Sequence, residues 1–311
     1  MRYNQAVVLS PSRASHAMKS IVITVLIVLL TSPVLTAQEP KDVTMTIAAW
    51  NVKGRPEIDN ARAKQIAIGI AYLDAEVIAL TEVAPHSIIT KIKEELDDLG
   101  CPYKVSMPTA GQSELGIAIL FKDGVTKVAD AEFIEDAQLG PGDARKPVAI
   151  ELKTGDFDFK IIAVHLKSGS SGRQTRNEQC EKIAEYVETG LAIQDSEKDV
   201  LVVGDYNMIP RARGNRDDGN NFSKLNTNGR FNFISRGEMY GDGSHISGGR
   251  LGNVLDGFAI SSGRTEEYLD GSLRIFPLHK TMRRNLRDFS NEVSDHLPLV
   301  AKFDVASSDD D

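Results

Sequence analysis

The sequence has few aromatic residues and cysteines, no internal repeat and no excess of positive charge. Aromatic side chains make up 6% of its 311 residues, there are two cysteines, and 36 basic residues face 44 acidic ones. The lack of an excess of basic residues argues against a protein that packages nucleic acid nonspecifically. Any polyanion would have to be bound by a local basic patch or through a metal ion. The content of 41% hydrophobic and 26% charged residues is that of an ordinary globular protein.

The first 37 residues resemble a secretory signal peptide. Met18 and Lys19 precede an uncharged apolar run from Ile21 to Leu30, and small residues follow up to Ala37. This run is shorter than the roughly 20 residues that a membrane-spanning helix needs. We predict cleavage near Ala37 and a secreted or periplasmic protein, with a retained membrane anchor as the alternative. Loss of residues 1–37 removes three basic residues and no acidic ones, so the net charge changes from −8 to −11.

The two cysteines would reach an oxidising environment if the chain is exported. Cys101 and Cys180 could then form a disulfide. The sequence does not place their Cα atoms within disulfide range, so two separate buried thiols are the alternative.

Residues 41–305 are predicted to form one catalytic domain, followed by a disordered acidic tail at 306–311. Short β-rich segments alternate with a few amphipathic helical ones. The predicted strands are 45–51, 77–82, 116–122, 147–153, 157–165, 200–204, 254–260 and 297–303. The predicted helices are 60–73, 86–98 and 174–192.

The turn Thr154-Gly155-Asp156 separates two predicted strands and indicates a hairpin with antiparallel pairing. A purely parallel, doubly wound sheet is therefore not expected. We predict an α/β fold in which two mixed, mainly antiparallel sheets pack face to face and helices cover the outside.

Polar side chains recur where the predicted strands end. The segment LVVGDYNMIP, residues 201–210, ends an apolar strand on Asp205 and Asn207, which would project to one side of the strand. Taken alone, this pair is equally typical of a turn. Similar residues end or adjoin five further segments: Asn51, Glu82, His165, Asp256 and the pair Asp295-His296. Their recurrence predicts one shared site at the strand ends.

These residue types suit phosphoester hydrolysis assisted by a hard divalent cation. Mg²⁺ prefers oxygen ligands, which the carboxylates of Glu82 and Asp295 and the amide of Asn51 would supply; Mn²⁺ is a second candidate. His296 would act as the base for water near neutral pH, with Asp256 fixing its tautomer.

Four more residues are predicted to act on the substrate. Asp205 and Asn207 would orient the attacking water and the phosphate, while His165 and Lys167 would donate to phosphoryl oxygens. Each histidine considered alone is more often structural. Asp256 lies within an apolar strand and needs a partner, because a buried lone carboxylate is costly.

The ordered set Asn51, Glu82, His165, Asp205-x-Asn207, Asp256 and Asp295-His296 resembles the endonuclease/exonuclease/phosphatase superfamily. The resemblance covers nearly all of residues 44–303, and GDYN and SDHLPL are its most specific segments. It implies a four-layer α/β sandwich and Mg²⁺-dependent hydrolysis of a phosphoester. By position it also implies Asn51 and Glu82 as metal ligands, Asp205 and Asn207 at the nucleophile, Asp256 supporting His296 as base, and His165 at the phosphate.

Within this superfamily, the third motif AVHLKSG is closer to the deoxyribonuclease, sphingomyelinase and phosphatase branches than to AP endonucleases. Arg145 resembles an arginine that contacts phosphate in deoxyribonucleases, and Lys167 and Arg176 are further substrate-binding candidates, with solvated charges as the alternative. No long aromatic hairpin of the kind used by membrane-acting sphingomyelinases is evident, which weakens the lipid interpretation. Two basic clusters would form a positive rim beside the site: Arg211, Arg213 and Arg216, and Lys280, Arg283, Arg284 and Arg287.

We therefore predict an exported, metal-dependent phosphodiesterase, specifically a nuclease, that acts as a monomer with nucleic acid as its partner and no obligate protein partner. A phosphatase or sphingomyelinase-like enzyme acting on phospholipid or inositol phosphate is the alternative, and a secreted binding module without catalysis is a remote one. His86, His245 and His279 are predicted to be surface residues without a role.

Overall fold

The structure is a computed structural model. It describes residues 44–57, 59–108, 115–139, 145–193, 196–208, 223–235 and 243–306. The chain divides after Lys41, and all described residues belong to Asp42–Asp311. The predicted signal peptide, residues 307–311 of the predicted tail, and three members of the predicted rim (Arg211, Arg213 and Arg216) lie outside the described residues. Over the described ranges, no helix combines the length and the apolar character needed to cross a membrane.

The first of two large sheets has six strands, of which β1 and β2 pair in parallel and the others antiparallel. The strands, in spatial order, are β14 (Arg274–Ile275), β15 (Leu299–Asp304), β1 (Thr44–Asn51), β2 (Val77–Val83), β4 (Gly116–Phe121) and β3 (Lys104–Ser106).

The second sheet has seven strands and again one parallel pair, β8 with β9. In spatial order they are β10 (Phe231–Asn232), β13 (Asp256–Ser261), β9 (Val200–Asp205), β8 (Phe157–His165), β7 (Val148–Thr154) and β5 (Thr126–Lys127), while β6 (Glu132–Phe133) also pairs with β7. A separate hairpin joins β11 (Ile246–Ser247) to β12 (Arg250–Leu251). Both large sheets are mixed and mainly antiparallel, as the sequence predicts.

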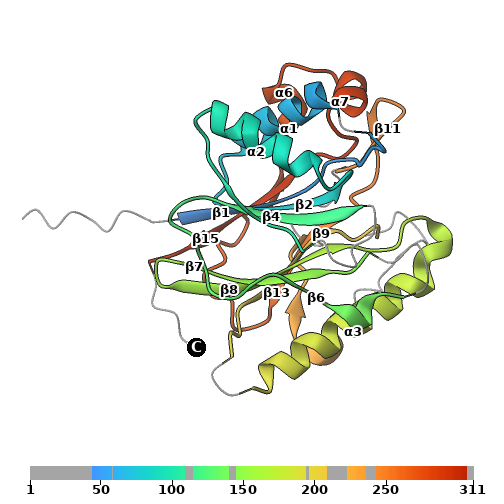
Figure 1. The fold of residues 1–311 in the computed structure, drawn as a ribbon. Helices are drawn as coiled ribbons and strands as arrows, with labels where there is room; N and C mark the ends of the chain where they lie inside the picture. Colours follow the sequence, from blue (N-terminus) through green and yellow to red (C-terminus); the bar gives the residue numbers. More distant parts are fainter. Residues whose placement is uncertain are drawn as a thin grey trace, which may run out of the picture. The chain divides into compact units, whose positions relative to one another are not determined.

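Helices cover the outer face of each sheet (Figure 1). The first sheet packs against α1 (Asn60–Leu73), α2 (Ile88–Asp98), α6 (Leu278–Thr281) and α7 (Leu286–Glu292), and the second packs against α3 (Arg173–Leu191). Short 3₁₀ turns lie at Glu135–Ala137, Ser170–Gly172 and Thr227–Gly229. The three predicted helices are confirmed within two residues at each end. The short helices α6 and α7 and the two- and three-residue strands are too brief to give a periodic signal in the sequence.

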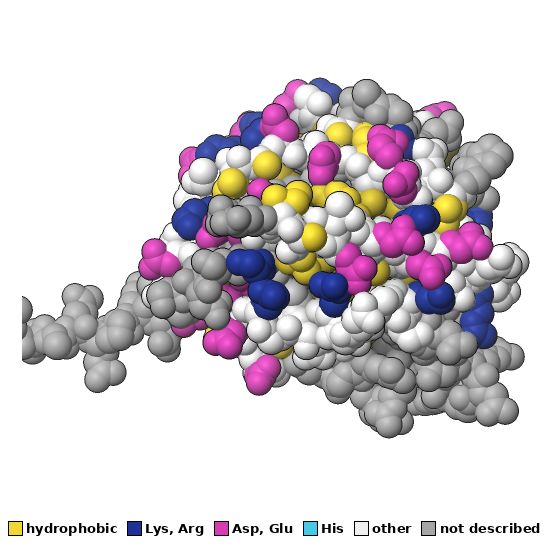
Figure 2. All heavy atoms as spheres, turned by 90° about the horizontal axis from the view of Figure 1, so that it is seen from below, with side chains coloured by type: hydrophobic (Ala, Val, Ile, Leu, Met, Phe, Trp, Pro, Cys, Tyr) yellow, Lys and Arg dark blue, Asp and Glu magenta, His cyan; other side chains and the backbone are white. Residues whose placement is uncertain are grey.

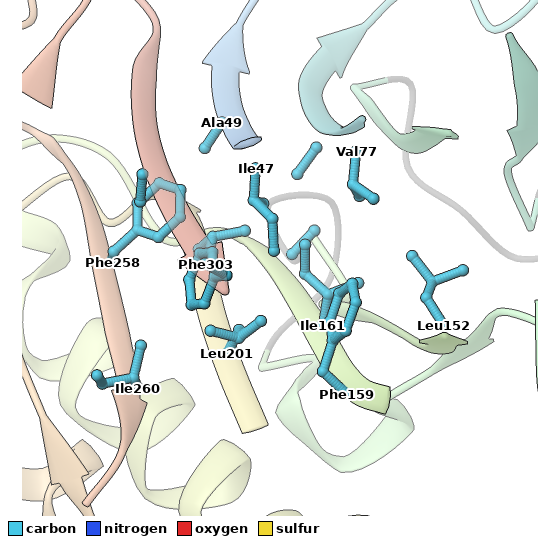
Figure 3. Packing of buried hydrophobic residues seen from close by; sticks show 14 of the residues in the cluster. Ile47, Ala49, Val77, Leu152, Phe159, Ile161, Leu201, Phe258, Ile260 and Phe303 are labelled. Carbon is cyan, nitrogen blue, oxygen red and sulfur yellow. The ribbon is translucent and has the colours of Figure 1, made fainter. Parts of the chain in front are cut away.

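Apolar side chains fill all three spaces between these four layers. Along β1, Met45, Ile47 and Ala49 point into the core between the sheets, while Ala48 and Trp50 point toward the helices of the first sheet. Figure 3 shows Ile47 and Ala49 close to residues of the second sheet such as Phe258. Because both faces of β1 are covered, its sequence is continuously apolar. Polar side chains are therefore left to the strand ends.

The two cysteines lie in different layers. Cys180 is buried between the second sheet and α3, and Cys101 packs against the core between the first sheet and its helices. Both are free thiols, so a disulfide between them is wrong; the two thiols are separate, as the alternative states, but only Cys180 is buried. Burial raises the pKa of the Cys180 thiol well above its usual range.

The face shown in Figure 2 carries acidic and basic side chains interspersed, with a narrow streak of apolar ones. This mixture gives no uniform positive surface there. A polyanion would have to be held elsewhere, or by a local arrangement of donors.

Candidate active site

Three polar side chains form a row across neighbouring strands of the second sheet. In the strand register, Asp205 at the end of β9 pairs with His165 at the end of β8 and with Asp256 at the start of β13. Residues paired across neighbouring strands point to the same face of a sheet. All three are buried, with 1–2% of each residue exposed. The register therefore gathers them at one edge of the sheet, as the sequence predicts.

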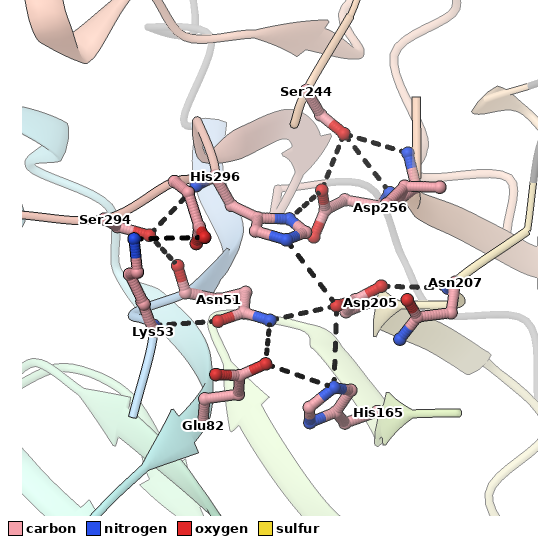
Figure 4. Close-up of polar contacts among 12 residues, drawn as sticks. Asn51, Lys53, Glu82, His165, Asp205, Asn207, Ser244, Asp256, Ser294 and His296 are labelled. Atoms are coloured by element: carbon pink, nitrogen blue, oxygen red, sulfur yellow. Dashed lines mark hydrogen bonds and ion pairs between the residues drawn. The ribbon is translucent and has the colours of Figure 1, made fainter. Parts of the chain in front are cut away.

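Two residues of the first sheet complete the cluster from the other side. Asn51 ends β1, and its Nδ2 donates to Oε1 of Glu82 at 3.0 Å and to Oδ2 of Asp205 at 2.9 Å. This amide joins the two sheets at their shared edge, as Figure 4 shows. Nε2 of His165 lies 3.4 Å from Oε1 of Glu82 and 3.6 Å from Oδ2 of Asp205.

Glu82 reaches the cluster because the backbone of β2 is irregular at this position. The pairing of β2 with β4 shifts register between Leu80 and Val83, and Glu82 has a φ of 57°. Such bulges turn a side chain out of the regular alternation. Gly54 then donates its N–H to Oε2 of Glu82 at 3.0 Å. A Cβ at Gly54 would lie 2.6 Å from Leu115 and 2.8 Å from Ala84, so only glycine fits this close approach.

His296 lies just before β15 and is bound to the row through Asp256. Its Nδ1 lies 2.8 Å from Oδ2 of Asp256, to which Ser244 also donates its hydroxyl at 2.6 Å. Nε2 of His296 lies 3.9 Å from Oδ2 of Asp205. The predicted pairing of Asp256 with His296 is present in the structure, and Ser244 is a member that sequence reasoning missed.

Backbone contacts fix the segment that carries His296. The indole N–H of Trp50 donates to the carbonyl of His296 at 2.9 Å. The hydroxyl of Ser294 donates to the carbonyl of Asn51 at 2.6 Å and accepts from the N–H of His296 at 3.0 Å. Sequence reasoning missed Ser294. Its position next to the Asp295-His296 pair is the signal that could have indicated it.

Arg62 is a buried cation on α1 that joins the segment after β1 to the segment before His296. Its Nε donates to the carbonyl of Val293 at 3.2 Å, and its Nη2 donates to the carbonyls of Val52 and Lys53. Burial lowers the pKa of Arg62 to about 10, so it stays charged near neutral pH. In the sequence, Arg62 resembles an ordinary charged residue on the surface of a helix. Nothing in the sequence indicates that it donates to these carbonyls.

Burial and charge set the protonation of the three central groups. Burial raises the pKa of Asp205 to about 7. Burial alone would lower the pKa of His296, but the carboxylates of Asp256 and Asp205 outweigh it and raise the pKa to about 10. Burial, helped by the Arg145 guanidinium, holds the pKa of His165 well below 6.5, so this imidazole is neutral. Near neutral pH, His296 is therefore protonated, while Asp205 is close to its midpoint.

Asn207 lies in the loop after β9 and is bound to the loop after β8. Asn207, with a φ of 50°, donates its amide to the carbonyl of Leu166 at 3.0 Å, and its N–H donates to Oδ1 of Asp205 at 2.8 Å. That second contact is the turn expected of an Asp-x-Asn pair, so the turn and the site coexist. Because β9 ends at Asp205, Asn207 is placed by its left-handed backbone and not by strand alternation, which corrects the prediction.

The three predicted substrate-binding cations differ in their surroundings. Nη1 of Arg145 lies 2.8 Å from Nε2 of His165, which brings a guanidinium to the cluster. Arg176 is buried and donates to the carbonyls of Lys167 and Gly169 at 2.8 Å, so it holds the loop in shape. Lys167 is half-buried, and its contact with substrate stays a prediction.

The predicted ligand Asp295 faces a cation. Its Oδ2 lies 3.2 Å from Nζ of Lys53. Two groups of side chains do bring ligand atoms within 4.8 Å of one another: Glu82, His165 and Asp205, and Asp205, Asp256 and His296. In the described part of the chain, these groups are the candidates for a metal centre.

A hard divalent cation fits the Glu82 side of this centre. Oε1 of Glu82 and Oδ2 of Asp205 approach the same neutral amide nitrogen of Asn51 and the neutral imidazole of His165. Two carboxylates that share neutral partners repel each other, and a divalent cation with oxygen ligands relieves that repulsion.

The histidines predicted to be surface residues require correction. His279 is 8% exposed and packs against the ring of Phe289. His245 is half-buried, and its ring centroid lies 5.0 Å from that of His296. A short bridge between the backbones of these two residues brings them together, which sequence spacing did not indicate. His86 lines a cavity of about 750 Å³ beside the loop that holds Glu82, together with Gly54, Arg55, Pro56, Ala84, Pro85, Ser87 and Leu115.

Known proteins share this fold. D. rerio TDP2 complexed with a single-stranded DNA product matches at a TM-score of 0.62 and 16% identity, over 85% of this chain and 100% of that one. The human nocturnin catalytic domain with bound sulfate matches at a TM-score of 0.58 and 16% identity, over 84% and 94%. An endonuclease/exonuclease/phosphatase family protein from Bacteroides thetaiotaomicron matches at a TM-score of 0.58 and 14% identity, over 84% of this chain and 98% of that one.

A search of curated protein sequences found no match. The model of the Endonuclease/Exonuclease/phosphatase family matches residues 48–296, which span the site from the end of β1 to His296. The chain belongs to the endonuclease/exonuclease/phosphatase family of phosphoester hydrolases.

Proposed function

We propose that this protein is a divalent-metal-dependent phosphodiesterase that hydrolyses nucleic acid. The supporting observation is the convergence of Glu82, His165, Asp205, Asp256 and His296 at one edge of the two sheets, joined by the Asn51 amide. The single-stranded DNA product held by the D. rerio relative favours nucleic acid as the substrate class. The sulfate bound to nocturnin is a tetrahedral anion with the shape of a phosphate.

Glu82 and Asp205, with Asn51 beside them, would hold Mg²⁺ or Mn²⁺. When bound, such a cation polarises a phosphoryl oxygen and stabilises the leaving alkoxide. Asn51 keeps the two carboxylates together across the sheets, and Gly54 fixes the second oxygen of Glu82. Arg145, held beside His165, supplies a guanidinium that can donate to a phosphate.

His296, once deprotonated, would take the proton from the attacking water. Asp256, oriented by Ser244, holds Nδ1 of His296, which leaves Nε2 pointing toward Asp205. Asn207 fixes Asp205 through its backbone N–H and ties it to the loop after β8. The proton acceptor would thus be oriented by a buried carboxylate.

A parallel substrate assay tests this proposal. The purified protein is incubated with plasmid DNA, RNA, sphingomyelin and inositol phosphates, with Mg²⁺ or with EDTA, beside His296→Ala. We expect cutting of nucleic acid that EDTA and the substitution both abolish. Release of phosphocholine or phosphate with intact nucleic acid would instead assign the phosphatase or sphingomyelinase alternative.

We also propose that the chain is exported after cleavage near Ala37 and acts as a monomer. The support for export is the basic start and the short apolar run before Ala37. The mass of the protein recovered from the periplasm or medium tests the cleavage, and recovery of the full-length chain in the cytoplasm would contradict it. Light scattering on the recovered protein measures the oligomeric state.

A further inference from the structure

The cavity of about 750 Å³ described above lies beside the part of the site that is most open to solvent. Of the five side chains in the two candidate metal groups, that of Glu82 is 22% exposed, whereas those of His165, Asp205, Asp256 and His296 are between 1% and 7% exposed. Within this cluster, a substrate therefore has its widest access on the Glu82 side. The loop that follows Glu82 forms one wall of the cavity, so the site and the cavity open next to each other.

Gly54 joins the cavity to Glu82. Its N–H donates to Oε2 of Glu82 at 3.0 Å, and the space beside its Cα is filled by Leu115 and Ala84, which line the cavity. The next residue, Arg55, donates its N–H to the carbonyl of Ala84 at 3.3 Å. The segments after β1 and after β2 are therefore bonded to each other, and a single glycine separates the cavity from a candidate metal ligand.

The cavity has apolar walls and a cationic edge. Among the described residues that line it, none carries a carboxylate; the apolar ones are Pro56, Ala84, Pro85 and Leu115, and Arg55 and His86 add polar groups. The guanidinium of Arg55 donates to the carbonyl of Asn291, and its Nη1 lies 3.8 Å from Oδ2 of Asp59. These contacts hold the guanidinium in place at the cavity.

This lining suits a nucleobase better than the other groups considered for the substrate. A choline group is cationic, so the guanidinium of Arg55 repels it and no lining carboxylate attracts it. The hydroxyls of an inositol ring would lose water against proline and leucine without gaining partners. A nucleobase is flat and uncharged, and its edge accepts hydrogen bonds while its faces bury apolar surface. The volume lies within the range of roughly 300–1,000 Å³ that is usual for small-molecule sites.

We infer that this cavity holds the base next to the scissile phosphate, so that the protein acts on single-stranded or unpaired nucleic acid. The inference rests on the proposed function and names the form of its substrate. A base within a duplex is stacked and paired, and it enters a cavity only after it is flipped out at a cost in free energy. The cavity therefore selects the substrate, while the clustered residues act on its phosphate.

Cleavage of strands with and without bases tests the inference. The substrates are oligothymidylate, the same strand annealed to its complement, and a strand of equal length in which a tetrahydrofuran spacer replaces every nucleoside. We expect wild type with Mg²⁺ to show a kcat/KM for oligothymidylate at least tenfold above that for either other substrate. Ser87→Trp places a large side chain at an exposed position of the lining and should lose the preference for bases.

Ser262→Trp is the matched control. Ser262 is also exposed, but it follows β13 at the end of that strand remote from Asp256, so this variant should keep the preference. Pro56→Trp fills the cavity from the segment after β1 and should lose the preference as Ser87→Trp does. Thermal midpoints identify a variant that fails to fold, and Pro56→Trp and the wild-type preference then decide the matter.

The contrary results separate the inference from the proposed function. Equal rates on oligothymidylate and the base-free strand, or a preference that persists in both folded cavity variants, would overturn the inference and leave nuclease activity intact. A duplex cut as fast as the single strand would do the same. A wild type that cuts none of the three substrates would overturn the proposed function together with the inference.

Discussion

Nδ1 of His296 lies 2.8 Å from Oδ2 of Asp256, and both side chains are buried at the edge where the two sheets meet. The carboxylate both orients the imidazole and raises its pKa, and the hydroxyl of Ser244 keeps the carboxylate in place. A buried carboxylate with two donors is stable where an unpartnered one would be costly.

Asp256→Asn is expected to reduce turnover and to shift its pH dependence. Removing this carboxylate takes away the main influence that raises the pKa of His296, so the imidazolium loses its proton at lower pH. If unprotonated His296 accepts the proton, the rising limb of the rate profile moves to lower pH, while the maximum falls by about 10²–10⁴-fold. The pH profiles of kcat for both proteins measure this. A rising limb that stays in place would remove His296 from the proton transfer.

His296→Ala is expected to destabilise the fold as well as abolish turnover. The substitution leaves the Asp256 carboxylate with Ser244 as its remaining side-chain donor, in a site with almost no exposed surface. An under-satisfied buried polar group costs about 1–3 kcal/mol. Thermal or urea unfolding measures the loss, and a variant as stable as wild type would show that water replaces the imidazole.

Glu82→Gln is expected to remove most of the stabilisation that Mg²⁺ gives. A ligand that binds the folded state raises its stability in proportion to the logarithm of its concentration over Kd. The loss of the carboxylate charge should therefore shrink the Mg²⁺-dependent rise in the thermal midpoint. Glu76→Gln is the control, because Glu76 precedes β2 at its opposite end and its Oε2 accepts from the N–H of Thr46 at 2.7 Å. An unchanged Mg²⁺ response in Glu82→Gln would exclude Glu82 as a ligand.

Gly204→Ala is expected to lower stability and disturb Asp205, the next residue. Gly204 has a φ of 129°, and a Cβ there would lie 2.3 Å from the carbonyl oxygen of Val164. Either strand β8 or β9 would have to shift. Gly190→Ala in α3 is the matched control, since the nearest atom is 4.0 Å away, and it should be neutral or stabilising by up to about 1 kcal/mol. Equal midpoints for the two variants would contradict the close approach of β8 and β9.

Arg62→Met is expected to lower stability by at least about 2 kcal/mol, because three carbonyl oxygens lose a shared donor. Activity should fall as well, since those carbonyls belong to the segments that carry Lys53 and Asp295-His296. Lys64→Met on the same helix is the control, because its ammonium is exposed. Unfolding curves and kcat measure the two effects. A stable, fully active Arg62→Met would show that the hydrogen bonds from Arg62 to these three carbonyls are not needed.

The polar residues at the strand ends predicted the row His165, Asp205 and Asp256. The prediction succeeded because the register of neighbouring strands brings residues at their ends together. It also paired Asp256 with His296. The site of Asp295 was not predictable, because its partner Lys53 takes a left-handed backbone conformation that no sequence pattern marks. The same holds for Glu82, which reaches the cluster through a bulge. Ser244 and Arg62 act through contacts between segments distant in the chain.

Trp50 has a further consequence. It is the single tryptophan of the chain, it is buried, and its indole N–H is bonded to the carbonyl of His296. Intrinsic fluorescence excited through indole therefore comes from one place, directly behind the histidine of the site. The protein thus has a built-in optical probe, and a change in its emission on adding metal or substrate would report on the site without an attached label.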